Sequence, residues 1–228
     1  MDLKHSAVAA FWAERLGCPV SAFERPGFSV VSHPQPDRVF VMAAGAALVV
    51  AAPEALHAHL RAVPNAAALV TPEALRPLLP SGARLIGPAR IAYLHGALST
   101  PDGVMRVTSA GDRRLRALRE GVTPEEWQHA NLDAAEPPLF GWRVGDAIAA
   151  AAGFERLLGR VAHIGVVADA RHRARGYGRA VVQAAAAHAL ALGLLPQYQT
   201  LAANAPALRI AESLGFEPFA TTLAARLS

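Results

Sequence analysis

The residues best suited to chemistry form an arginine- and glycine-rich segment in the last third of the chain. It follows the apolar residues Val166, Val167 and Ala168 and consists of Arg173, Ala174, Arg175, Gly176, Tyr177, Gly178 and Arg179. This composition predicts a strand that runs through a turn into the start of a helix. A helix N-terminus presents backbone N–H groups without intrahelical partners at the positive end of the dipole, and glycines let a ligand approach the backbone. Together with the arginines, the segment suits a pyrophosphate.

Other uses of such a segment fit the sequence less well. A P-loop needs Gly-Lys-Ser/Thr, but the one lysine is Lys4, and a dinucleotide fingerprint needs a small residue where Val181 stands. The preceding strands are also expected to be antiparallel, whereas a dinucleotide fold is built on a parallel sheet. Binding of nucleic acid by the arginines is a further alternative, which predicts an affinity that falls steeply with salt and no competition by CoA.

The pattern Arg173-x-x-Gly176-x-Gly178 resembles the pyrophosphate loop of the GNAT superfamily of acetyl-CoA-dependent N-acyltransferases. A second match begins at Asn204 and ends in Leu-Gly-Phe at residues 214–216, which is similar to the closing helix of that family. The resemblance covers residues 100–228. The stretch Gly-Leu-Leu-Pro-x-Tyr at residues 193–198 is similar to the branch with an extra N-terminal α/β domain.

The resemblance implies an α/β (α+β) GNAT fold beside a smaller N-terminal α/β domain. In this fold a mixed, mostly antiparallel sheet opens in a V between two parallel strands, here residues 161–168 and 197–201. The resemblance also implies that acetyl-CoA lies in the V as the acyl donor. The backbone of residues 166–168 would then pair with pantetheine and polarise the thioester carbonyl. The N–H groups of residues 173–179 would hold the pyrophosphate, and Asn204 would approach the pantetheine arm.

Acetyl transfer to an amine needs a base, because the acceptor ammonium must lose a proton before its nitrogen attacks. In the family the base is often a glutamate on the strand that leads into the pyrophosphate loop. Here His163 is the nearest titratable residue on that strand, and the ordinary pKa of an imidazole, near ~6.5, suits the role. Glu155 and Glu136 are the alternatives, and a lone histidine on a strand is more often a packed or solvated residue.

The usual acid of the family is missing from this chain. Many members have a tyrosine in the last helix that protonates the leaving thiolate, at the position where this chain has Ala211. Tyr198, Ser213 or water could replace it, although a buried tyrosine on a strand more often belongs to the core. The missing tyrosine favours an alternative function, that of a non-catalytic acyl-CoA-binding module.

The elements that must position these residues can be read from hydrophobic patterns and turn signals. In the first half, helices are expected over residues 6–16, 53–63 and 71–79, and strands over residues 28–32, 39–43, 46–50 and 67–70. In the second half, strands are expected over residues 104–108, 139–144, 147–154, 161–168, 197–201 and 216–227, and helices over residues 112–120, 124–131, 176–192 and 204–214. The turn-rich segment 99–103 predicts a boundary between an N-terminal α/β domain, residues 1–98, and an acetyltransferase domain, residues 99–228.

Composition indicates a globular protein of a reducing compartment. Of the 228 residues, 53% are hydrophobic and 18% charged, and the longest apolar run, residues 39–52, is shorter than the ~18–20 residues of a transmembrane helix. The single cysteine, Cys18, and the lack of a signal-peptide pattern favour the cytoplasm. The net charge of +4 comes without a basic stretch that is interleaved with stacking aromatic residues, so nucleic acid is not expected as a partner.

We therefore expect an N-acetyltransferase that moves an acetyl group from acetyl-CoA to a primary amine of a small molecule or peptide. The expected partners are acyl-CoA and the amine, without a membrane partner. No metal is expected, because His57 and His59 stand two residues apart and point to different faces of a helix. The sequence contains no recognition signature for a particular acceptor.

Overall fold

The chain forms two compact units in the computed structural model, which describes residues 3–108 and 112–227. The first unit comprises Met1–Ile91, Thr200–Ala205 and Pro218–Ser228, and the second comprises Ala92–Gln199 and Pro206–Glu217. One short segment of the first unit therefore interrupts the second unit in sequence, and another follows it. The predicted domain boundary at residues 98/99 stays a prediction.

The first unit contains a mixed sheet with the strand order β1-β3-β2-β10-β4. Its strands are β1 (Gly27–Ser32), β2 (Arg38–Ala44), β3 (Ala47–Ala52), β4 (Arg84–Tyr93) and β10 (Glu217–Arg226). β1 runs parallel to β3, while β2 is antiparallel to both β3 and β10. Gly45 lies in the turn between β2 and β3 with a φ of +57°, which favours glycine. The apolar run at residues 39–52 thus forms two buried strands around Gly45, as predicted.

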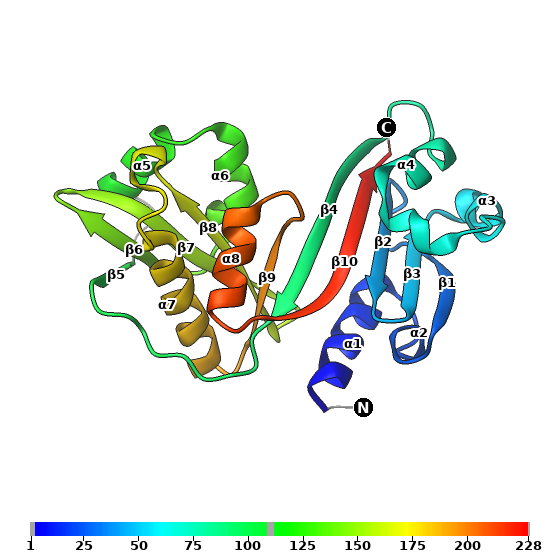
Figure 1. The fold of residues 1–228 in the computed structure, drawn as a ribbon, viewed down its shortest axis with the longest axis horizontal. Coiled ribbons are helices and arrows are strands. Elements are labelled where there is room, and N and C mark those ends of the chain that lie inside the picture. Colours follow the sequence, from blue (N-terminus) through cyan, green and yellow to red (C-terminus); the bar gives the residue numbers. More distant parts are fainter. Residues whose placement is uncertain (1–2, 109–111, 228) are drawn as a thin grey trace. The chain divides into compact units, whose positions relative to one another are not determined.

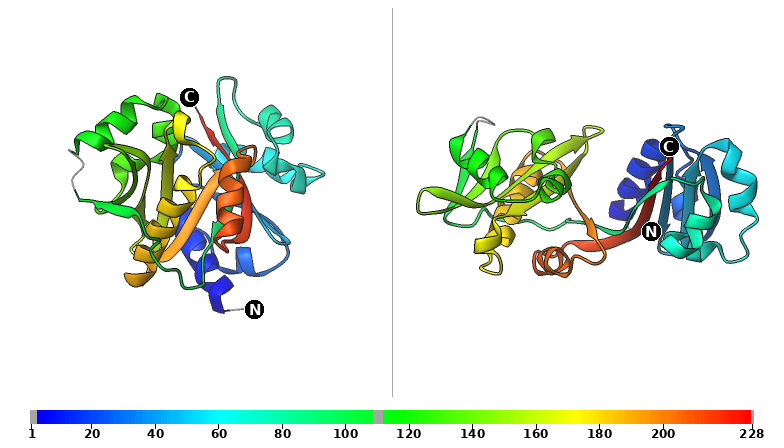
Figure 2. Two further views of the ribbon diagram at one scale, coloured as in Figure 1. Left: turned by 60° about the vertical axis from the view of Figure 1, so that its left-hand side comes forward. Right: turned by 90° about the horizontal axis from the view of Figure 1, so that it is seen from above.

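Helices cover both faces of this sheet, and Figure 2 shows α1 and α3 on opposite sides of the strands. On one side are α1 (Leu3–Leu16), whose Trp12 stacks on Phe40 at 5.5 Å, and α2 (Ser21–Glu24). The core on the other side is covered by α3 (His57–Arg61), η1 (Glu54–Leu56), η2 (Ala66–Val70), α4 (Pro72–Leu75) and η3 (Arg76–Leu78). The strand expected at residues 67–70 was wrong, because η2 is a 3₁₀ helix. Three of its five residues are alanine, which has little β propensity.

The second unit contains a sheet with the strand order β9-β8-β7-β6-β5. Its strands are β5 (Val104–Val107), β6 (Leu139–Val144), β7 (Ala147–Leu157), β8 (Val161–Ala168) and β9 (Leu195–Leu201) (Figure 1). The pairs from β5 to β8 are antiparallel, and β8 and β9 are parallel. The prediction of a mixed, mostly antiparallel sheet is confirmed.

Helices pack on both faces of the second sheet too. On one face, α7 (Tyr177–Ala191) and α8 (Ala205–Ser213) bury alternate residues of β8, including Ala162 and Ile164. On the other face, α5 (Arg113–Glu120) and α6 (Pro124–Ala130) pack with Val167. α6 begins with a capping box, in which Thr123 and Glu126 each accept a hydrogen bond from the other's backbone N–H. A 3₁₀ turn, η4 (Leu132–Ala134), follows α6.

Candidate active site

The parallel pairing of β8 with β9 stops before β8 ends. The register runs from Val161 opposite Leu195 to Ile164 opposite Tyr198, and β8 then continues to Ala168. Residues 166–168 remain paired with β7 on their other edge. Beyond Ile164, the backbone groups of β8 that point away from β7 are therefore not paired with β9. A strand needs such groups in order to pair with an extended ligand.

A buried aspartate anchors the turn that follows β8. Asp169 is 5% exposed, and its carboxylate accepts hydrogen bonds from the backbone N–H and the guanidinium of Arg171, at 2.9 and 2.6 Å. These bonds lower the pKa of Asp169 to about 2. His172 follows with a buried Nδ1 that has no hydrogen-bond partner among the described residues and lies 3.8 Å from Asp169 Oδ2. Asp169 was not predicted from the sequence, although an aspartate between a strand and an arginine-rich turn is a signal for such a cap.

Arg173 ties the turn to the strand before it and to α6. Its Nε donates to the carbonyl of Ala168 at 3.2 Å, and its Nη2 donates to Glu126 Oε1 at 2.6 Å. The other oxygen of Glu126 accepts from the backbone of Thr123 in the capping box at 3.1 Å. These contacts hold the pKa of Glu126 below its ordinary value, first through the Thr123 N–H and then through Arg173. The guanidinium of Arg173 thus supports the loop.

The loop that follows contains two residues in the left-handed conformation. Ala174 and Gly176 have φ angles of +60° and +82°, and α7 begins directly after Gly176. The first intrahelical hydrogen bond runs from Ala180 N to Gly176 O, so the N–H groups of residues 177–179 are not used within the helix. Left-handed residues before a helix N-terminus build the concave arrangement of N–H groups that binds anions. The loop residues therefore fit a pyrophosphate.

Polar side chains form a row across the sheet on the face that α6 covers. Glu155 of β7 lies opposite His163 of β8, and His163 lies opposite Gln197 of β9. His163 Nδ1 is 2.9 Å from Gln197 Oε1, and the Nε2 of this 1% exposed glutamine donates to the Tyr93 hydroxyl. The structure thus brings together His163 and Glu155, and adds Gln197 and Tyr93, which the sequence analysis did not single out.

The other carboxylates and polar candidates have partners of their own. Glu155 accepts a hydrogen bond from Asn131 Nδ2 at 3.0 Å, and Glu136 forms an ion pair with Arg156 at 3.1 Å. Ser213 accepts from Arg179 Nε at 3.1 Å and donates to the carbonyl of Ile210. Asn204 lies in the turn before α8, where its backbone N–H donates to the carbonyl of Leu201.

Tyr198 points to the other face of the sheet from its neighbour Gln197. It is 3% exposed, packs against Phe216 with ring centroids 5.7 Å apart, and belongs to the core under α7 and α8. Burial raises the pKa of its phenol well above the ordinary value. The structure therefore does not bring Tyr198 together with His163, because successive strand residues point to opposite faces. Its role as an acid stays a prediction.

Gly165 explains how α6 comes so close to the row. A Cβ placed on this residue would lie 1.7 Å from the carbonyl oxygen of Ala130, the last residue of α6. Only glycine therefore lets the end of α6 lie on β8 at this position. Asn131 follows directly, in the left-handed conformation with φ 50°, and from there its side chain reaches Glu155.

Comparisons with known proteins agree with this geometry. The model of the acetyltransferase (GNAT) family matches residues 111–216. A GNAT-family protein of Novosphingobium aromaticivorans has a similar structure, with 25% sequence identity and a TM-score of 0.52 over 66% of this chain and 70% of its own. A GNAT-family acetyltransferase of Colwellia psychrerythraea has 13% identity and a TM-score of 0.53 over 99% of this chain and 73% of its own. No curated protein shows significant similarity to the sequence.

Among residues 3–108 and 112–227, no helix is long and apolar enough to cross a bilayer. The same residues contain no cluster of three His, Cys, Asp or Glu side chains that could hold a metal ion. The order of strands, the end of the β8–β9 pairing and the loop before α7 agree with this match: residues 111–216 match the model of the GNAT acetyltransferase family, and the second unit has the GNAT fold.

Proposed function

We propose that the protein transfers an acetyl group from acetyl-CoA to a primary amine of a small molecule or peptide. The observation that carries this proposal is that the β8–β9 pairing ends at Ile164, on the strand that leads into a loop with two left-handed residues just before α7. In the reaction the amine nitrogen forms a bond to the thioester carbon, the C–S bond breaks, and CoA leaves as a thiolate. The proton lost by the amine passes to a base.

The donor would bind through backbone groups. The N–H groups at the start of α7 would hold the pyrophosphate, with the positive charge of Arg175 and Arg179 beside them. Backbone N–H groups of residues 166–168 on the free edge of β8 would bind pantetheine and stabilise the oxyanion that forms from the thioester carbonyl. The carbonyl of Ala168 already accepts from Arg173, so this oxygen stays with the loop.

His163 is the base that the hydrogen bonds favour. Gln197 turns its amide oxygen toward His163 Nδ1 and its amide nitrogen toward Tyr93. With the amide oriented in this way, a neutral imidazole would carry its proton on Nδ1, and Nε2 would be the basic nitrogen. Glu155, the cross-strand neighbour of His163, would stabilise the imidazolium that forms after proton transfer.

Departure of CoA would need no strong acid. Ala211, which stands where many family members have a tyrosine, is 7% exposed and has no proton to give. A thiol has an ordinary pKa near ~8.5, so its thiolate is a tolerable leaving group at neutral pH. Solvent can protonate the thiolate after the C–S bond has broken.

Two measurements test this function. Release of free thiol is followed with acetyl-CoA and a panel of primary amines, and CoA affinity is measured by calorimetry on Gly176→Val. Gly159→Val is the matched control, because Gly159 has a similar φ of +69° and equally open surroundings at a distant turn. We expect CoA affinity to fall at least tenfold in Gly176→Val only. Unchanged affinity would refute the loop assignment, and CoA binding without thiol release for any amine would support the acyl-CoA-binding module.

A further inference from the structure

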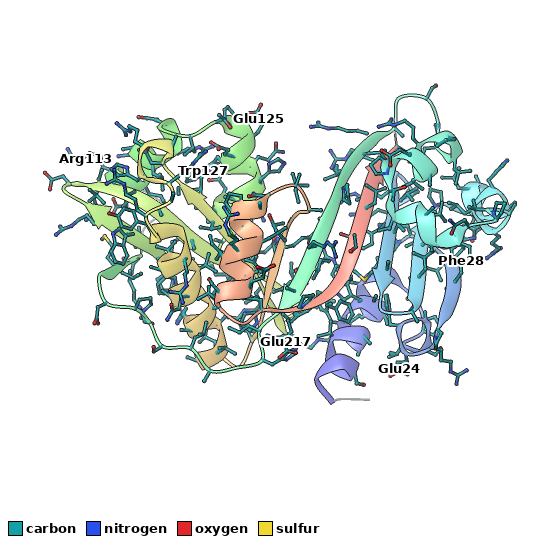
Figure 3. All side chains as sticks on the ribbon, viewed as in Figure 1. Glu24, Phe28, Arg113, Glu125, Trp127 and Glu217 are labelled. Carbon is teal, nitrogen blue, oxygen red and sulfur yellow. The ribbon has the colours of Figure 1, made fainter. Side chains whose placement is uncertain are left out.

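A cavity that the proposed chemistry does not use lies where α5 meets α6. It has a volume of about 520 Å³ and is lined by Arg119, Val122, Pro124, Trp127, Gln128, Asn131 and Asp133. Figure 3 places Trp127 on α6. The charged groups in its wall are Arg119 at the end of α5 and Asp133 in η4. The cavity therefore combines an aromatic ring, two amides and one charge of each sign.

The carboxylate of Asp133 is held in place by a buried residue. Trp127 is 7% exposed, and its indole N–H donates to Asp133 Oδ2 at 3.0 Å. An indole N–H is a donor only, so it orients a carboxylate without neutralising its charge. The Trp127 ring and the Asp133 carboxylate, which we call the cation platform, thus keep a fixed arrangement that suits a positive group.

Arg119 occupies this platform from within the chain. Its guanidinium carbon lies 5.3 Å from the centroid of the Trp127 ring, and its Nη1 lies 3.4 Å from Asp133 Oδ1. The side chains of Arg119 and Asp133 are 57% and 61% exposed, so their ion pair contributes little stability. Arg119 is long and flexible, whereas the platform is anchored by Trp127, which means that another cation can take the place of Arg119.

The platform lies beside the polar row that contains the proposed base. Asn131 lines the cavity and at the same time donates a hydrogen bond to Glu155, the cross-strand neighbour of His163. The cavity is therefore separated from the row by one side chain. An acceptor whose amine lies at His163 would have to extend past Asn131 and Glu155 to reach Asp133.

We propose that the acceptor carries a second cationic group, which displaces Arg119 from the platform of Trp127 and Asp133. This inference rests on the proposed acetyl transfer and names the chemical class of its substrate: a linear diamine or polyamine, with one amine acetylated and another held as an ammonium. Recognition by the platform selects such molecules over amines of the same length that have an uncharged tail.

The experiment compares putrescine, cadaverine and spermidine with monoamines of matched length, using thiol release from acetyl-CoA. The quantity measured is the diamine preference, the ratio of kcat/KM for a diamine to that for its monoamine. We expect Asp133→Asn to lower this preference about fivefold, as the loss of one partly exposed charge contact would. Arg119→Met should raise it, because the platform is then vacant. Arg116→Met, an exposed arginine of the same helix, is the control and should leave the preference unchanged.

Calorimetric titration with cadaverine separates failure of this inference from failure of the proposed function. Binding to the wild type that weakens in Asp133→Asn supports the platform even if no amine is acetylated, in which case the proposed function fails alone. Acetylation of monoamines and diamines with equal kcat/KM in the wild type would overturn the inference while acetyl transfer stands. A lower diamine preference in Arg119→Met would overturn it as well, since Arg119 would then belong to the binding site.

Discussion

Replacing Gly165 with alanine tests how closely α6 must lie on β8. The added Cβ would be 1.7 Å from the carbonyl oxygen of Ala130 and 2.8 Å from its carbonyl carbon, and both are backbone atoms that cannot rotate away. Ordinary contacts need about 3.4 Å, so the end of α6 must shift by roughly 1.5–2 Å; overpacking of this kind costs about 1–3 kcal/mol. We expect a loss near the upper end of that range, because a helix end has to move. The shift also draws Asn131 away from Glu155, and kcat/KM for acetyl transfer should fall.

The assay is urea unfolding followed by circular dichroism, with two matched variants. Gly96→Ala adds a Cβ that meets nothing within 4 Å, and its free energy of unfolding should equal that of the wild type. Gly153→Ala brings a Cβ to 2.9 Å from the Cβ of Ala135, a much smaller overlap than the one at Gly165, and should have an intermediate effect. The reasoning is refuted if Gly165→Ala unfolds at the same urea concentration as Gly96→Ala.

The remaining predictions concern the base and the loop. His163→Ala should lower kcat/KM by ~10²–10⁴ and flatten one limb of its pH profile, whereas an unchanged rate and profile would exclude it as the base. Gln197→Leu should lower kcat/KM about tenfold through loss of the preferred tautomer, and Gln197→Glu should move the same limb to higher pH, because a carboxylate favours the imidazolium. Asp169→Asn should lower the urea midpoint at pH 7. Because the Asp169 pKa is lowered to about 2 from an unfolded value near ~3.9, its stabilising contribution is complete above pH ~4 and disappears as the pH falls through about 2. The midpoint of this variant should therefore lie further below that of the wild type at pH 7 than at pH 3, and the opposite order would contradict that sign.

Local signals predicted much of the second unit and of its loop. The glycines of the loop, the apolar strand before it and the alanine-rich helix after it are neighbours in sequence, so their conformations follow from backbone chemistry within a few residues. The helix over residues 124–131 and the strands over residues 39–43 and 46–50 were predicted for the same reason, and the structure confirms them as α6, β2 and β3. The 3₁₀ helix at Ala66–Val70 was missed, because a short alanine-rich run has no clear period of its own.

The candidate site itself depends on register between distant segments. Gln197 is 34 residues from His163 and 104 from Tyr93, and Arg173 is 47 residues from Glu126. Which residues face one another across β7, β8 and β9 depends on strand pairing, and a shift of one residue would turn His163 toward the α7 face. The sequence by itself therefore determined the family resemblance, the order of elements and the conformation of the glycine-containing turn before α7. Only the tertiary structure decided that His163 has Gln197 as its partner, that Tyr198 lies in the core, and that Trp127 and Asp133 share a cavity, because packing summed over the whole unit sets these contacts.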